Sequence, residues 1–146
     1  FYQFTNVNES EIYGFEAALD WMVRDNLRLR SAVSYTREDA TEIPPTLSVD
    51  GTYPELQFSL RSEWSPSENL DVAAFIRYVD EIEFRSIEDY WQANVNVRWS
   101  PDDHWVVSAG VRNLLDKATV ENTSELGDIV LTAIERTAFV NLRYSF

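Results

Sequence analysis

Large apolar residues alternate with polar or small residues along most of this chain, in segments of about ten residues. In the closing segment ERTAFVNLRYSF, one face carries Val140, Leu142, Tyr144 and Phe146, and Phe139 is the only large apolar residue on the other. A period of two is typical of a β-strand, and helical spacing is hard to sustain in any window. The pattern therefore predicts an all-β chain.

Seven segments carry the pattern, at 11–22, 27–38, 54–64, 70–79, 89–99, 105–114 and 136–146, and residues 1–6 resemble the end of an eighth strand. Short polar turns at 23–26, 65–69 and 100–104 alternate with longer loops at 39–53, 80–88 and about 115–135. Much of the negative charge lies in these loops. An antiparallel up-and-down meander with this asymmetry is typical of an outer-membrane β-barrel.

Aromatic residues gather near the ends of the predicted strands. The candidates for a membrane-interface girdle are Trp21, Trp64, Trp99 and Trp105 beside the short turns, and Tyr35 and Tyr78 toward the long loops. Trp and Tyr side chains are stable at the level of lipid headgroups, so two such belts favour a membrane barrel. A soluble sandwich would more often place tryptophans in the middle of its strands.

Composition narrows the function classes. Aromatic residues make up 14% and charged residues 25% of the chain, which suits a structure with one apolar and one polar side. The formal net charge of −13 argues against nucleic acid as a partner. The chain has no cysteine, so disulfides and thiolate metal sites are excluded, and we expect no cofactor or metal. A membrane-spanning helix would need roughly 20 apolar residues, and no segment approaches that length.

These patterns leave alternatives open. Alternation with regular turns also occurs in soluble barrels and sandwiches. The polar strand faces, the contrast between short turns and long loops, and the terminal aromatic favour a membrane barrel. The alternative is a small eight-stranded outer-membrane barrel or a soluble β-domain that acts as a binding or structural module.

Four stretches together resemble TonB-dependent outer-membrane receptors, in the order and spacing of that family. GVRNLLDK (110–117) is similar to the family's near-terminal Asn-Leu-Leu/Phe-Asp element, here Asn113, Leu114, Leu115 and Asp116. RTAFVNLRYSF (136–146) resembles the final strand, which ends in Phe. TNVNESEIYGFEAALDW (5–21) and TYPELQFSLRSEWSP (52–66) resemble an Asn-led segment with Tyr-Gly-x-Glu and a Pro-led descending strand.

The resemblance implies that residues 1–146 form a single segment, about seven C-terminal strands of a transmembrane barrel of about 22. It implies TonB-dependent active uptake of a large scarce solute, such as siderophore-iron, cobalamin or a glycan. The family contacts TonB through an N-terminal plug region, which we expect to be absent from this chain.

The resemblance also implies partners at the bacterial outer membrane. They are outer-membrane lipids, lipopolysaccharide and the barrel-assembly machinery. The family's assembly signal corresponds to Phe146, with Tyr144 and Leu142 before it.

A series of arginines lies on the predicted polar faces: Arg28, Arg30, Arg61, Arg77, Arg98, Arg112 and Arg143. They could contact acidic groups of a plug or an anionic substrate. The favoured interpretation is pairing within the wall, with Glu16, Asp20 and Glu63 as partners.

Catalysis has little support in the sequence. Ser100, Asp102 and His104 lie together in the turn SPDDH, which superficially suggests a hydrolase. Residues so close in one tight turn rarely orient as nucleophile, base and orienter. We therefore expect no enzyme.

Overall fold

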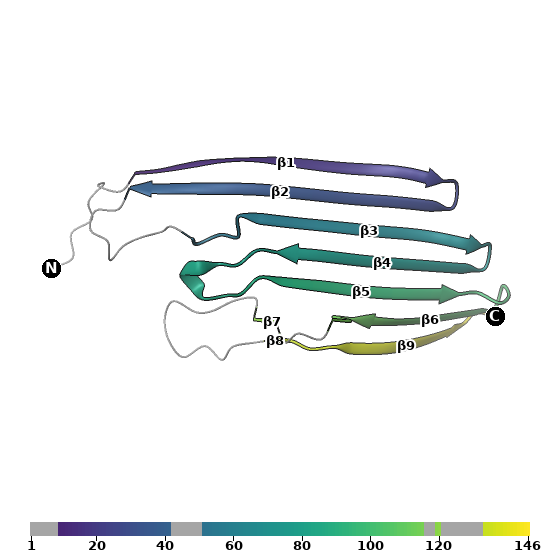
Figure 1. Ribbon diagram of the computed structural model, residues 1–146. Coiled ribbons are helices and arrows are strands. Elements are labelled where there is room, and N and C mark those ends of the chain that lie inside the picture. Colours follow the sequence, from purple (N-terminus) through teal and green to yellow (C-terminus); the bar gives the residue numbers. More distant parts are fainter. Residues whose placement is uncertain (1–8, 42–50, 116–118, 121–132) are drawn as a thin grey trace.

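The computed structural model describes residues 9–41, 51–115, 119–120 and 133–146, which form one large antiparallel sheet and a small strand pair (Figure 1). The sheet contains β1 (Glu9–Arg24), β2 (Leu27–Thr41), β3 (Leu56–Ser67), β4 (Leu70–Val79), β5 (Tyr90–Trp99), β6 (Trp105–Arg112) and β9 (Thr137–Tyr144), in that order. β7 (Thr119–Val120) pairs with β8 (Ala133–Ile134), and the 3-10 helix η2 (Glu83–Arg85) lies between β4 and β5. The predicted antiparallel meander is therefore confirmed.

Several predicted boundaries are wrong, and β-bulges explain two of them. The register shifts between Met22 and Arg24 in β1 and between Trp64 and Ser67 in β3. A bulge interrupts the alternation, so the period-two pattern ended both strands too early. The region predicted as the loop 115–135 contains the pair β7 and β8. The suggested strand end at 1–6 lies outside the described residues.

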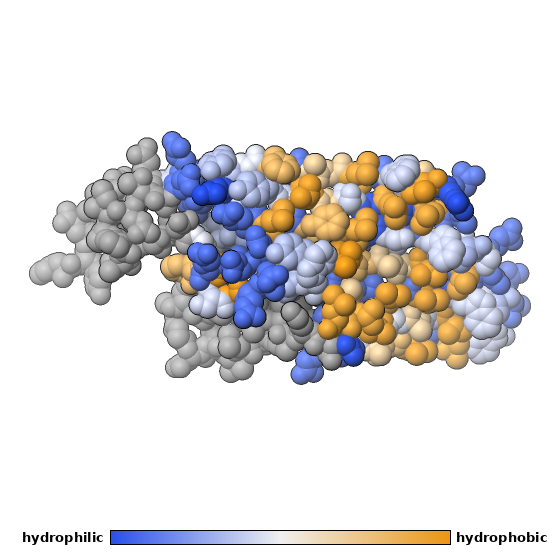
Figure 2. Space-filling model, viewed as in Figure 1, coloured by the Kyte–Doolittle hydropathy of each residue, from blue (hydrophilic) through white to orange (hydrophobic). Residues whose placement is uncertain are grey.

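The register joins the apolar faces of neighbouring strands into one surface. A single row of paired residues crosses five strands: Trp64, Val72, Val97, Ala109 and Val140. Figure 2 shows apolar side chains gathered over the middle of the strands, with polar side chains toward the two ends. We call this side of the sheet the apolar face.

The sheet is a single layer with almost no core of its own. The only buried hydrophobic residues in the described part of the chain are Val79, Ile87 and Tyr90, while Val140 is 77% exposed. Sheets of soluble domains bury their apolar face against a second layer. This apolar face therefore requires lipid or another protein surface. In the described ranges, no helix has the length and apolar character to cross a membrane.

The buried residues form a cluster at the loop end of β4 and β5. Val79 pairs with Tyr90, and the connection closes through a bridge between Ile82 and Ile87. A nitrogen of the Arg77 guanidinium donates a hydrogen bond to the Tyr90 hydroxyl at 3.0 Å. The connection predicted as a loop at 80–88 is thus a packed structure.

Gly14 marks a close approach between β1 and β2. It pairs with Thr36, and a Cβ at Gly14 would lie 2.1 Å from the backbone oxygen of Tyr35. A backbone atom cannot move aside as a flexible side-chain tip can. The glycine of the Tyr-Gly-x-Glu stretch is therefore required by packing.

We expect Gly14→Ala to lower the free energy of unfolding of the intact protein by about 1–3 kcal/mol, because the new methyl group overlaps the β2 backbone. Ala18→Ser on the same strand and face should change it by about 0.5 kcal/mol or less. Urea unfolding in lipid vesicles measures both. Equal losses for the two variants would contradict the close approach.

Candidate functional site

The second face of the sheet, here called the polar wall, holds the charged and amide side chains of the strand interiors. Within the strands it carries Glu16, Asp20, Arg28, Arg30, Gln57, Arg61, Glu63, Arg77, Gln92, Asn94, Asn96, Arg98 and Arg112, together with Phe75 and Phe139. In a closed membrane barrel, the polar face lines the lumen and the apolar face meets lipid. The polar wall is therefore the candidate site.

On β1 to β3, charged side chains of the polar wall form ion pairs with one another. Two nitrogens of the Arg28 guanidinium donate hydrogen bonds to the Asp20 carboxylate, and the Nε–Oδ1 distance is 2.7 Å. Glu63 accepts hydrogen bonds from Arg30 and Arg61, each at 3.0 Å. Arg30 also lies 3.8 Å from Asp20, so the groups form one network. Pairing within the wall is thus confirmed for these five residues.

Glu16 behaves differently from the prediction. It accepts a hydrogen bond from the Ser34 hydroxyl at 3.4 Å, and none of the ion pairs in the described residues includes it. The predicted pairing of Glu16 with an arginine is therefore wrong. On the neighbouring strand β2, Glu16 pairs with Ser34, and the flanking residues of the same face, Ala32 and Thr36, carry no charge.

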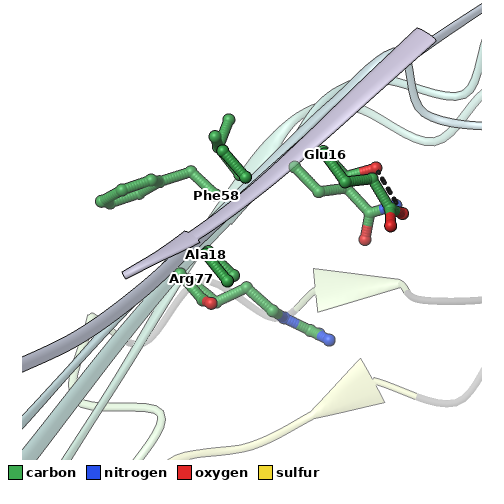
Figure 3. A pocket seen from close by; sticks show the side chains of 10 residues that line it. Glu16, Ala18, Phe58 and Arg77 are labelled. Carbon is green, nitrogen blue, oxygen red and sulfur yellow. Dashed lines mark hydrogen bonds between the residues drawn. The ribbon is translucent and has the colours of Figure 1, made fainter. Parts of the chain in front are cut away.

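A hollow of about 530 Å³ lies beside Glu16 on the polar wall. Its polar-side lining is Glu16, Ala18, Ala32, Ser34, Gln57, Ser59 and Arg77. Figure 3 shows Glu16 and Arg77 on one side of the sheet, with Phe58 pointing to the other. The hollow can therefore accept a side chain or solute group from the lumen between a carboxylate and a guanidinium.

Toward β9 the polar wall has more cations than acids. Arg98 lies 3.6 Å from Asp71 of the same wall. Arg112 instead lies over the ring of Phe139, 5.7 Å from its centroid. Within the described ranges, neither Arg112 nor Arg143 is in an ion pair. The predicted pairing therefore does not extend to these two arginines.

Four girdle candidates and the assembly residues lie at the end of the apolar face that carries the short turns. Trp105 pairs with Tyr144, and their ring centroids are 4.6 Å apart. Tyr144 also meets Phe146 edge to face at 5.4 Å. Leu142 is 62% exposed on the same face. Trp21, Trp64 and Trp99 lie near the same ends of their strands.

The other two girdle candidates lie toward the loop end of the same face. Tyr35 packs against Phe15 with ring centroids 5.9 Å apart. Tyr78 packs against Trp91 at 5.0 Å. Both contacts join neighbouring strands. The membrane depth of the two belts stays a prediction.

Asn113 follows the last residue of β6, and the backbone leaves the extended conformation there. Its side chain is 1% exposed, and its φ of 51° lies in the left-handed region, where Asn is among the few residues accommodated. Its backbone N–H donates to the side-chain oxygen of Asn94 at 2.9 Å. Leu114 donates to the Ala93 carbonyl at 2.8 Å and accepts from Arg136 at 2.9 Å. Asn113 and Leu114 are therefore tied to β5 and to the segment before β9.

The sequence analysis missed Asn94, because its partner is 19 residues away and no local pattern joins them. Leu114 and Leu115 are exposed at 43% and 48%. Asp116 lies outside the described residues.

The turn at His104 serves the backbone. One carboxylate oxygen of Asp102 accepts hydrogen bonds from the N–H groups of His104 and Trp105, at 2.8 and 3.0 Å. The His104 ring stacks on Tyr144 at 6.0 Å. In the described part of the chain, no group of three or more His, Cys, Asp or Glu residues could hold a metal ion.

We expect Asn113→Ala to destabilise the intact protein by about 1 kcal/mol more than Asn113→Gly. Both variants lose the buried amide, but only alanine strains the left-handed backbone. Urea unfolding of the two variants in lipid vesicles gives the difference. Equal stability would show that the backbone conformation at Asn113 does not matter.

Solved structures with a similar fold are outer-membrane receptors and a transporter. The ferripyoverdine receptor FpvA of Pseudomonas aeruginosa has a TM-score of 0.73 and 18% identity, with 94% of this chain and 20% of that chain covered. The closed form of Fiu, the ferric-catecholate import receptor of E. coli K12, has a TM-score of 0.76 and 18% identity, covering 95% and 21%. The copper transporter OprC has a TM-score of 0.58 and 16% identity, covering 94% and 24%.

This chain therefore spans between 20% and 24% of the length of these three proteins. At such identities the likeness shows the fold. A comparison with curated proteins gives no match. The model of the family "TonB dependent receptor-like, beta-barrel" matches residues 1–114 of the 146. The chain belongs to the family of TonB-dependent receptors and forms part of their outer-membrane β-barrel.

Proposed function

We propose that residues 1–146 are the C-terminal wall segment of a receptor that takes up a large scarce solute by TonB-dependent active transport. The observation that carries this proposal is the open sheet. Among the residues that the structure describes, β1 and β9 are edge strands and no second layer covers the apolar face. Unpaired edges and a broad apolar face favour a sector of a larger membrane barrel over a self-contained domain.

Among siderophore-iron, cobalamin and glycans, we favour siderophore-iron as the transported solute. FpvA is described as bound to ferripyoverdine, and Fiu as an import receptor for ferric catecholates. OprC is described as a copper transporter. Two of these three similar structures are thus named for iron complexes.

The partners follow from the same proposal. The apolar face meets outer-membrane lipids and lipopolysaccharide, because exposed Leu142 and Val140 require an apolar solvent. Coupling to TonB requires a plug region that precedes this segment in the whole receptor. The barrel-assembly machinery binds the closing strand at Phe146.

Gene context and growth test the proposed function. We expect the reading frame to encode a signal peptide and a plug domain before these residues. Deletion of the gene should abolish growth on one ferric siderophore as the sole iron source and leave growth on ferric citrate unchanged. A reading frame of 146 residues alone, or growth unchanged on every ferric siderophore and on cobalamin and glycans, would contradict it.

A closing-strand substitution tests the assembly signal. Phe146→Ala in the whole receptor should lower its abundance in the outer membrane about tenfold, since loss of one favourable contact of about 1.4 kcal/mol shifts an equilibrium by that factor. Ligand affinity of the assembled fraction should not change. Ser145→Ala is the matched control. Surface protease digestion measures abundance, and an unchanged amount of Phe146→Ala receptor would remove the assembly role.

A further inference from the structure

The connection between β6 and β9 is too long to set how these two strands pair. Between β3 and β4 the chain turns at once, because β3 ends at Ser67 and β4 begins at Leu70. Such a short turn fixes the register of the two strands that it joins. β6 ends at Arg112, whereas β9 begins only at Thr137. The register of the closing strand therefore depends on contacts between β6 and β9 themselves.

The apolar face restricts this register only in part. A slip by one residue would turn the apolar side chains of β9 to the polar wall, but a slip by two keeps every side chain on its own face. The paired Ala109 and Val140 are aliphatic, and so are most of their neighbours on this face, so they discriminate little between the two cases. Trp105 pairs with Tyr144 and would meet Phe146 in one of the slipped registers, where it keeps an aromatic neighbour.

The polar wall supplies a contact that only the observed register allows. Phe139 is the large apolar residue that breaks the alternation of β9, and it pairs with Gly110. A Cβ at Gly110 would lie 2.7 Å from Cζ and 2.8 Å from Cε1 of the Phe139 ring, so the ring occupies the space that a side chain would need. A slip by two would place Phe139 opposite Ser108 or Arg112, which both carry side chains.

Arg112 encloses the Phe139 ring further. Its guanidinium carbon lies 5.7 Å from the ring centroid, which is within the range of a cation–π contact. Phe139 is 37% exposed, compared with 77% for its neighbour Val140 on the other face of the same strand. The ring is thus covered by residues of β6, although β9 is an edge strand of the described sheet.

We propose that the packing of Phe139 on Gly110 specifies the register of the closing strand. A slip by two residues would move β9 along β6 by about 7 Å. Tyr144 and Phe146 would move by the same distance relative to Trp105. The contact therefore also fixes where the C-terminal aromatic residues lie among the residues near the short turns. The register is specified in this way whatever solute the receptor transports.

Disulfide trapping in the whole receptor measures the register. Residues 1–146 contain no cysteine, so introduced thiols are the only ones in this segment. Ala109→Cys with Val140→Cys reports the observed register, because directly opposed strand residues lie within reach of a disulfide. Ala109→Cys with Ala138→Cys, or with Leu142→Cys, reports the two registers that are slipped by two. The slip ratio is the disulfide yield of the slipped pairs divided by that of the observed pair, per assembled receptor in outer-membrane vesicles.

We expect Phe139→Ala to raise the slip ratio about tenfold, which corresponds to about 1.4 kcal/mol between the registers. Phe139→Leu keeps apolar bulk but lacks a flat ring, so it should also raise the ratio, and it decides the test if Phe139→Ala does not assemble. Phe139→Tyr keeps the ring and should leave the ratio unchanged. Asn141→Ala, two residues along the same face of β9, is the matched control and should leave it unchanged as well.

The test varies Phe139 and leaves Gly110 in place. A Cβ at Gly110 would also lie 2.8 Å from the backbone oxygen of Val95, so a substitution there would disturb the pairing with β5 for a separate reason. An unchanged slip ratio in Phe139→Leu would overturn the proposal. An equal rise in Asn141→Ala would overturn it too, and so would a loss of assembled Phe139→Leu receptor without a rise in the ratio.

Discussion

The structure depends on the register between neighbouring strands. Because side chains alternate along a strand, a slip by one residue would turn every side chain to the opposite face. The apolar row from Trp64 to Val140 exists only in this register. The same holds for the row on the polar wall that consists of Glu63, Ala73, Asn96, Gly110 and Phe139. The two bulges, after Met22 in β1 and after Trp64 in β3, lie at the turn end, where they leave the strand interiors in register.

The two faces then have separate tasks. The apolar face gives the sheet its place in a bilayer, since it has no partner layer within the described chain. The polar wall changes along the sheet, from the ion-pair network around Asp20 and Glu63 to the acid-poor region around Arg112. The charged side chains are therefore linked to one another on β1 to β3, whereas Arg112 contacts an aromatic ring.

Sequence alone predicted what depends on local periodicity. The alternation identified the seven strands and assigned residues such as Leu60 and Arg61 to opposite faces. It did not predict the pairing of β7 with β8 or the hydrogen bond between Asn113 and Asn94. Nor did it predict that the Phe139 ring packs against Gly110. Each of these joins positions far apart in the chain. A tertiary contact leaves no local pattern to detect, and Phe139 was visible only as an exception to one.

The most direct test of the account is a nitroxide scan along β5 in the whole receptor reconstituted in lipid. Spin labels at successive positions from Gln92 to Arg98 report their collisions with oxygen, which concentrates in the bilayer, and with a water-soluble nickel complex. The account predicts a period of two, with the highest oxygen accessibility at Ala93, Val95 and Val97. Equal accessibility at all positions, or maxima at Asn94 and Asn96, would contradict a sheet with its apolar face in lipid.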